Sequence, residues 1–376
     1  MTLNKRGGLI LAGFLVVTAF AYNPVANVIL ACRLLLAVKS LASGATGEGL
    51  SVTQTKVHQE IGERRLEALV YQRSGSNPKH AVMLLSGVSE LGCYHPRLVA
   101  LSRTLADKGF LVLTPDIEMF RRFEVSPDAI GEILFWYEEI SQLRRARGAR
   151  GAGIIGISFS GTLALMAAAR PEIRDSVPYV MGIGSYQDLV RCTQTWFASG
   201  PRTVAEGYYP TRFYGKWVVM TAALDMLAKQ DERKFLREAL LRLLLQKPPP
   251  PMPETLSQEA RRWYQLATMP EDRSDPELAR AIEIHLQPLF RRLSPDEAAS
   301  EVRCMVFLAH GAYDDLIPPE ESVELRRRMK QARSYLLISP FLTHTHPLGR
   351  VLDWGAKTRA QWDMFSFFYQ LARAAR

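Results

Sequence analysis

The stretch "GAGIIGISFSG" at residues 151–161 joins an apolar run to two serines that are one residue apart. Its first part has the apolar, β-branched composition of a buried strand. The small-residue stretch "TLALMAAAR" at 162–170 follows at once and is typical of a helix. The chain therefore passes from a strand into a helix through a turn of a few residues, and Ser158 lies in that turn.

Strands and helices alternate on both sides of this turn. After a predicted antiparallel hairpin at 51–72, the expected strands are 80–86, 110–116, 152–157, 179–184, 303–309 and 334–339, and the expected helices are 96–108, 126–148, 162–170, 319–332 and 356–374. This rhythm predicts an α/β protein with a mostly parallel sheet that is covered by helices on both faces. From about 186 to 300 only helices are expected, with a proline break at 247–253, which predicts an insertion after the sixth strand.

Composition limits the classes of function. The 376 residues are 47% apolar and 23% charged, which suits one large domain with an insertion. The net charge is +9, but no basic stretch is interleaved with aromatic residues, so we expect no nucleic-acid partner. Solvated helix faces with some affinity for an anionic membrane surface explain the charge better. The four cysteines are far apart, which excludes a disulfide framework and zinc spacing.

The first 42 residues differ in kind from the rest of the chain. No charged residue occurs from Gly7 to Cys32, and "LILAGFLVVTAFAY" at 9–22 is almost wholly apolar. A helix needs about 20 apolar residues to cross a bilayer, so we expect residues 1–42 to be an N-terminal membrane anchor. The alternatives are a cleaved signal with "AFA" at 19–21 as its processing site, a helical hairpin and an interfacial helix. Basic residues flank the segment on both sides, so charge does not choose the side of the membrane.

The turn at Ser158 fits the geometry that presents a serine nucleophile. In that geometry the serine lies at the tip of a sharp strand-to-helix turn, and the residues two before and two after it are small. Gly156 and Ser160 meet this requirement around Ser158. Ser160 as the nucleophile would place Thr162 at the second flank, which is a worse fit. An ordinary turn whose serine caps the helix is the alternative interpretation.

A serine nucleophile needs a histidine as its base and a carboxylate that orients the histidine. Both follow later strands, in the order serine, acid, histidine that is expected for such a sheet. Asp314 and Asp315 follow the strand at 303–309, and His344 and His346 follow the next strand. A metal site at the two histidines is disfavoured, because no carboxylate or cysteine stands near them in the sequence.

These motifs resemble those of the α/β-hydrolase superfamily, over roughly residues 50–375. "GISFSG" at 156–161 is similar to its nucleophile elbow, and "HGAYDDLIPPE" at 310–320 is similar to its acid loop. "LLSGVSELG" at 84–92 resembles its oxyanion loop, with Ser86 in place of the usual histidine. The resemblance implies an α/β-hydrolase fold in which the core comprises residues 50–185 and 301–376 and the helical cap comprises residues 186–300.

The resemblance also implies roles for individual residues. In this sequence they are the nucleophile Ser158, the acid Asp314, the base His344, and the backbone N–H groups of Val88 and Phe159 as oxyanion donors. His344 is preferred to His346 because it lies five residues beyond the strand end at Ser339, close to the family's usual interval. Asp315 falls on a variable position of the acid loop.

We therefore expect a membrane-associated serine hydrolase of the esterase or lipase kind. It would cleave an ester or related acyl bond of a small-molecule or lipid-like substrate through a covalent acyl-enzyme, with no cofactor. Carbon–carbon and peptide bonds are open to the same triad, whereas a dehalogenase of this fold would need a carboxylate nucleophile. The rival hypothesis is a catalytically silent α/β-hydrolase fold that acts as a membrane-tethered binding module.

Overall fold

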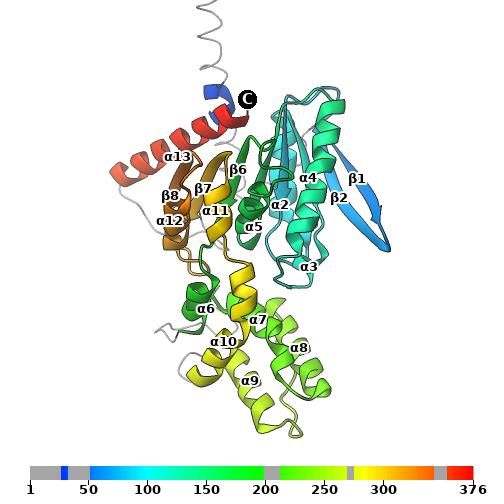
Figure 1. Ribbon diagram of the computed structural model, residues 1–376, viewed down its shortest axis with the longest axis vertical. Coiled ribbons are helices and arrows are strands. Elements are labelled where there is room, and N and C mark those ends of the chain that lie inside the picture. The colour runs from blue at the N-terminus through cyan, green and yellow to red at the C-terminus, as the bar shows by residue number, and fades with distance from the viewer. Residues whose placement is uncertain (1–26, 33–50, 199–211, 269–274, 343–353, 376) are drawn as a thin grey trace, which may run out of the picture.

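An eight-stranded sheet in the order β1-β2-β4-β3-β5-β6-β7-β8 forms the centre of the larger lobe (Figure 1). This computed structural model describes residues 27–32, 51–198, 212–268, 275–342 and 354–375. The strands are β1 (Val52–Ile61), β2 (Arg64–Arg73), β3 (His80–Leu85), β4 (Phe110–Pro115), β5 (Ala152–Ile157), β6 (Tyr179–Ile183), β7 (Met305–Gly311) and β8 (Ser334–Ser339). β1 and β2 form the predicted antiparallel hairpin, and β3 to β8 run parallel to one another.

Helices cover both faces of this sheet, which explains why its central strands are apolar throughout. Successive side chains of β3 enter opposite layers: Met83 and Leu85 belong to one buried cluster, and Leu84 belongs to the other. On the first face lie α4 (Ala129–Ala146), α5 (Phe159–Ala168), α11 (Asp296–Glu301) and α12 (Pro319–Arg328). On the second face lie α2 (Pro96–Asp107) and α13 (Trp354–Ala375). The predicted mostly parallel, doubly covered sheet is confirmed.

Between β6 and β7 the chain forms a second lobe, which lies below the sheet in Figure 1. Its helices are α6 (Leu189–Phe197), α7 (Arg212–Ala222), η2 (Leu224–Met226), α8 (Gln230–Leu244), α9 (Gln258–Thr268) and α10 (Pro276–Arg292). We call these helices the cap. The proline-rich stretch at 247–253 connects α8 to α9 without regular structure. Two short helices, η1 (Gly92–Tyr94) and α3 (Glu118–Arg121), lie in the loops after β3 and β4.

Several predicted helix boundaries differ from those observed, and two of them have a local cause. Helix α4 begins at Ala129, two residues after Pro127, and the Ser126 hydroxyl instead accepts a hydrogen bond from the Asp128 N–H at 3.1 Å. Helix α12 ends at Arg328 instead of residue 332, because Met329 adopts an extended backbone and is buried against the core. Neither shift moves a strand end, so the loops that carry the candidate site stay where the sequence predicts them.

Both connections between cap and core are held by a carboxylate: a buried one, Glu321, on the outgoing connection and an exposed one, Asp296, on the returning connection. Glu321, at the start of α12, is fully buried and accepts the N–H groups of Gln187 and Asp188 at 2.9 and 2.8 Å. Its other oxygen binds Arg191, whose pKa is raised by this hydrogen bond. On the returning connection, Asp296 accepts the Gln187 side-chain amide at 2.8 Å. The outgoing and returning segments are therefore joined directly to each other.

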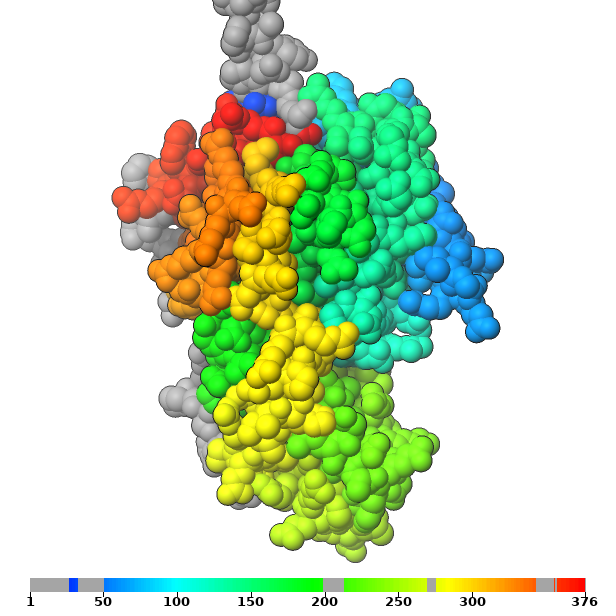
Figure 2. Space-filling model, in the orientation of Figure 1, coloured from blue at the N-terminus to red at the C-terminus, as the bar shows by residue number. Residues whose placement is uncertain are grey.

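Residues 27–32 form a short helix that packs on the core at the end of α13 (Figure 2). Leu30 and Ala31 are buried in the apolar cluster that contains α13, whereas Val28 and Ile29 are 40% and 47% exposed. The rest of the predicted anchor at 1–42 lies outside the described residues. Within the described part of the chain, no helix is long and apolar enough to span a bilayer.

Candidate active site

Ser158 occupies a strained turn between β5 and α5. Its backbone has φ 60° and ψ −129°, a conformation that residues other than glycine rarely adopt. The turn is held on both sides: the Ser158 N–H donates to the Ile183 carbonyl at 2.6 Å, and the Gly161 N–H donates to the Ser158 carbonyl at 2.9 Å. This backbone projects the side chain beyond the end of the sheet, as a nucleophile elbow requires.

Gly156 and Ser160 show why small residues flank the elbow. A Cβ on Gly156 would lie 2.4 Å from the Ser160 carbonyl oxygen, so no side chain fits there. Ser160 is fully buried, and its hydroxyl accepts the Ile157 N–H at 2.9 Å and can donate to the Ile157 carbonyl at the same distance. Ser160, which replaces the usual glycine, therefore stabilises the backbone of the turn through its hydroxyl and is buried away from solvent.

The two predicted oxyanion donors lie on either side of this turn. Val88 follows β3, which neighbours β5, and a Cβ on the preceding Gly87 would lie 3.6 Å from the Ser158 Cβ. Phe159 is the first residue of α5, and its ring stacks on Tyr186 at 5.8 Å and meets Phe120 edge-on at 5.9 Å. The oxyanion loop and the start of α5 therefore meet beside Ser158.

Asp314 lies in the loop after β7, where its side chain is only 2% exposed. One carboxylate oxygen accepts the N–H groups of Leu316 and Ile317, each at 3.0 Å. The other lies 3.4 Å from Nε2 of the fully buried His310. His310 also donates from Nε2 to the Ile317 carbonyl at 2.8 Å, so its ring closes the acid loop from below. This role was not predicted from the sequence, although His310 begins the "HGAYDD" motif.

The base candidates His344 and His346 lie outside the described residues, so the choice between them stays a prediction. The positions of Ser158 and Asp314 set the distance that the base must bridge. β6 separates β5 from β7, so the strand ends that carry Ser158 and Asp314 are about 10 Å apart. The base must therefore bridge a hydroxyl and a carboxylate that are carried by strands at that separation.

The cap contacts two loops at this end of the sheet, the loop after β3 and the loop after β7. The Tyr214 hydroxyl of α7 donates to the Val88 carbonyl, and the Trp196 indole N–H of α6 donates to the Leu316 carbonyl. Burial raises the pKa of Tyr214, so its phenol stays a donor at neutral pH. The sequence predicted no contact between these two side chains and the loops. No sequence signal marked their partners, which are backbone carbonyls more than a hundred residues away.

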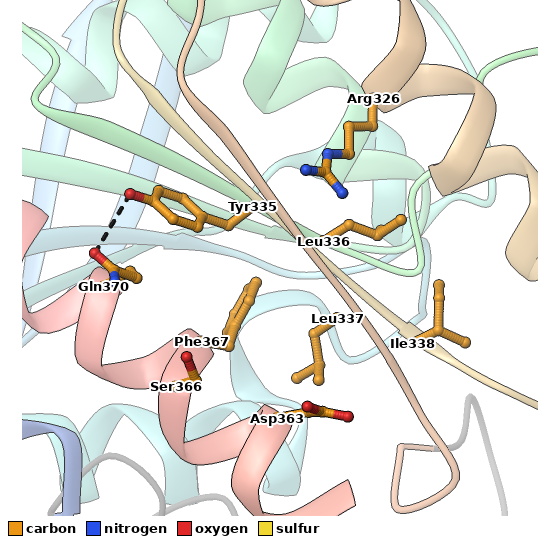
Figure 3. Close-up of a pocket in the computed structure, with 9 residues that line it drawn as sticks. All are labelled: Arg326, Tyr335, Leu336, Leu337, Ile338, Asp363, Ser366, Phe367 and Gln370. Carbon is orange, nitrogen blue, oxygen red and sulfur yellow. Dashed lines mark hydrogen bonds between the residues drawn. The ribbon is translucent and has the colours of Figure 1, made fainter. Parts of the chain in front are cut away.

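A groove of about 300 Å³ lies elsewhere, between β8 and α13 (Figure 3). It is lined by Arg326, Asp363, Ser366, Phe367 and Gln370 together with the residues 335–338 of β8. None of the predicted site residues belongs to this lining. The groove is therefore separate from the candidate active site.

The parallel sheet, the elbow at Ser158 and the helical insertion after β6 together define the α/β-hydrolase fold, and with it a serine hydrolase. The family model described as X-Pro dipeptidyl-peptidase (S15 family) matches residues 149–346. This match covers more than half of the 376 residues, and the chain belongs to that family. No curated protein sequence was found to match.

Solved structures similar to this chain include peptidases and esterases. Acylaminoacyl peptidase from Pyrococcus horikoshii is 12% identical with a TM-score of 0.48; the match covers 87% of this chain and 41% of that one. A brefeldin A esterase, described as a bacterial homologue of human hormone-sensitive lipase, is 14% identical with a TM-score of 0.46, and 91% and 86% are covered. Est1E from Butyrivibrio proteoclasticus is 13% identical with a TM-score of 0.45, and 84% and 99% are covered.

Removing the Tyr214 hydroxyl should impair turnover more than it impairs stability. We predict that Tyr214→Phe lowers kcat/KM about tenfold, because the oxyanion loop loses the bond that fixes Val88, and lowers the free energy of unfolding by about 1 kcal/mol. Tyr264→Phe is the matched control, since Tyr264 donates to the Pro250 carbonyl within the cap at 2.6 Å. It should cost similar stability and leave kcat/KM unchanged. Equal losses of kcat/KM in both variants would contradict a role for Tyr214 at the site.

Proposed function

We propose that this protein hydrolyses an ester or related acyl bond by covalent catalysis at Ser158. The observation that carries the proposal is the backbone of Ser158, which is held at φ 60° between β5 and α5 although this conformation costs free energy. A residue kept in such a conformation by its surroundings indicates a functional constraint. A serine that merely capped the helix would need no positive φ, and Ser158 makes no side-chain cap hydrogen bond to α5.

The proposed reaction uses Ser158, His344 and Asp314 as a triad. The Ser158 oxygen attacks the substrate carbonyl while the histidine takes its proton, and the N–H groups of Val88 and Phe159 stabilise the oxyanion. The leaving group departs with that proton, which gives the acyl-enzyme. Water then attacks the acyl-enzyme, and its proton passes through the histidine back to Ser158. Asp314 supports this role because its carboxylate is buried and fixed by two backbone N–H groups.

A fluorophosphonate probe tests the nucleophile. We predict that the wild-type protein reacts with one probe per chain and that Ser158→Ala abolishes labelling. Ser160→Ala is the matched control: it should still label, with stability lowered by about 1–2 kcal/mol, because the Ile157 N–H loses its acceptor. A folded wild-type protein that never labels would instead support the binding-module hypothesis. Loss of labelling in Ser160→Ala alone would move the nucleophile to Ser160.

The two histidines make a separate prediction. Residues two apart in an extended loop point to opposite sides, so only one of them can meet both Ser158 and Asp314. We predict that His344→Ala lowers acyl turnover by a factor on the order of 10⁴, and that His346→Ala costs far less. Turnover is to be measured on variants shown to be folded by circular dichroism. The opposite ranking would assign the base to His346, and mild losses in both would argue against the triad.

A second candidate function is cleavage of a peptide bond after an Xaa-Pro dipeptide. The family match at residues 149–346 favours it, because the description of that family names this activity. The same triad would form an acyl-enzyme from either bond. Steady-state kcat/KM on an Xaa-Pro nitroanilide and on a series of nitrophenyl acyl esters separates the two candidates. A preference for the nitroanilide that survives changes in the acyl chain would replace the ester proposal.

We also propose that residues 1–26 attach the protein to a membrane. The supporting observations are the uncharged stretch from Gly7 to Cys32 and the place where it joins the body. The helix at 27–32 packs on the core through Leu30 and Ala31, so the apolar stretch emerges from a fixed point. The anchor proposed in this form is shorter than residues 1–42, because part of that range is buried in the core.

A further inference from the structure

Basic residues precede all six parallel strands. They are Lys79 before β3, Lys108 before β4, Arg150 before β5, Arg174 before β6, Arg303 before β7 and Arg333 before β8. We call these six residues the basic edge. Because the strands run parallel and nearly in register, their starting ends meet along one edge of the sheet. Residues scattered through the sequence are therefore gathered at one end of the molecule.

Backbone hydrogen bonds join the neighbouring segments of the basic edge. The Arg150 N–H donates to the Lys79 carbonyl at 3.1 Å, and the Lys79 N–H donates to the Gly109 carbonyl at 2.9 Å. Farther along, the Val306 N–H donates to the Arg333 carbonyl at 2.9 Å. These bonds fix the segments relative to one another, so the basic edge is a built surface.

Acidic residues offset only part of this charge. Ion pairs at this end include Lys108 with Asp107 at 2.6 Å, Arg303 with Asp175 at 3.0 Å, and Arg174 with Glu301 at 3.7 Å and with Asp175 at 3.9 Å. In the part of the chain that the structure describes, Lys79 and Arg333 are exposed and form no ion pair with a carboxylate. Arg73 and Arg373 add exposed positive charge at the same end. The end therefore carries an excess of positive charge.

The helix dipole does not account for the basic edge. Helices α4 and α12 do have basic residues in their last turns, where cations stabilise a helix. That effect is confined to the last turn. Lys79 lies in the loop between β2 and β3, and Arg333 lies directly before β8, beyond the last turn of α12. Because both are exposed and neither forms an ion pair with a described carboxylate, their charges are available to a partner outside the chain.

The apolar N-terminal stretch joins the molecule at this same end. The helix at 27–32 lies against the last turns of α13, on the far side of the sheet from the cap (Figures 1 and 2). Its exposed side chains Val28 and Ile29 face away from the core. Positive charge beside exposed apolar side chains and an apolar chain segment matches the chemistry of an anionic bilayer surface.

We propose that the basic edge and the helix at 27–32 form a face that rests on an anionic lipid bilayer. This inference rests on the proposed anchor for its insertion but has its own source of binding free energy, the attraction of Lys and Arg to acidic headgroups. The proposal also orients the enzyme. Ser158 and Asp314 follow the opposite ends of their strands, toward the cap, so the active site opens away from the bilayer and takes substrate from the aqueous phase.

Vesicle titration of the full-length protein tests this face. Cys32 is exposed and the other three cysteines are buried, so a polarity-sensitive fluorophore on Cys32 reports from the proposed face without further engineering. The protein is titrated with vesicles of phosphatidylcholine and with vesicles of equal parts phosphatidylcholine and phosphatidylglycerol. We expect tighter partitioning to the anionic vesicles, by about fivefold for each basic residue near the surface, and a loss of this difference at high salt.

Matched charge variants locate the effect. One variant combines Lys79→Gln, Arg303→Gln and Arg333→Gln. It should lower partitioning to anionic vesicles about a hundredfold and leave partitioning to neutral vesicles unchanged. The control combines Lys234→Gln, Arg237→Gln and Arg291→Gln, which remove the same charge from exposed positions in the cap. It should behave as wild type. Circular dichroism verifies that both variants are folded.

Each result has a defined meaning. Equal partitioning to both vesicle types, or equal losses in the two variants, would overturn the proposed face. A response to heparin as strong as the response to anionic vesicles would assign the face to soluble polyanions and also overturn it. Absence of any partitioning to neutral vesicles would contradict the anchor and leave the face standing. Failure of the hydrolase proposal would appear separately, as absence of labelling and turnover.

Discussion

The close crossing of β5 and α5 at Gly156 is the constraint on which the candidate site depends. With 2.4 Å between a Cβ at this position and the Ser160 carbonyl, the strand and helix can meet only if residue 156 has no side chain. Their contact forces Ser158 into its positive φ, at a cost of about 1–3 kcal/mol. Hydrogen bonds from Ser158 to β6 and from Ser160 to its own turn offset that cost. The conformation of Ser158 is thus set by the packing of β5 against α5.

Sequence periodicity predicted most of the fold because alternating strands and helices leave few arrangements of a parallel sheet. The order β2-β4-β3 was not predicted, since it depends on which edge accepts each strand, and that is a matter of long-range packing. The strained turn at Ser158 and the loop at Asp314 carry local sequence signals, so the sequence predicts where both lie, whereas their catalytic roles stay predictions. Glu321 and Tyr214 were missed because a buried carboxylate on a helix and a tyrosine in a cap look ordinary until their distant backbone partners are known.

The candidate site is supported from three separate layers. The sheet places Ser158 after β5 and Asp314 after β7, two strands away, and the buried His310 donates a hydrogen bond to the Ile317 carbonyl of the acid loop. From the cap, Tyr214 donates a hydrogen bond to the predicted oxyanion loop and Trp196 donates one to the acid loop. Glu321 also joins the start of the cap to α12. A displacement of the cap would therefore change the positions of both loops. Catalytic geometry and cap position are thus expected to be coupled.

The contact between the outgoing and returning segments of the chain also has an evolutionary consequence. The chain leaves the sheet domain at Tyr186 and returns near Leu293, and the Tyr186 hydroxyl donates to the Leu293 carbonyl at 2.9 Å. Two chain ends this close can be bridged by a short loop at little entropic cost. The helices between them can therefore be lengthened or shortened without disturbing the sheet, provided that Tyr214 and Trp196 keep their contacts with the Val88 and Leu316 carbonyls. Such an arrangement allows the choice of substrate to diverge among descendants while the hydrolytic machinery is inherited intact.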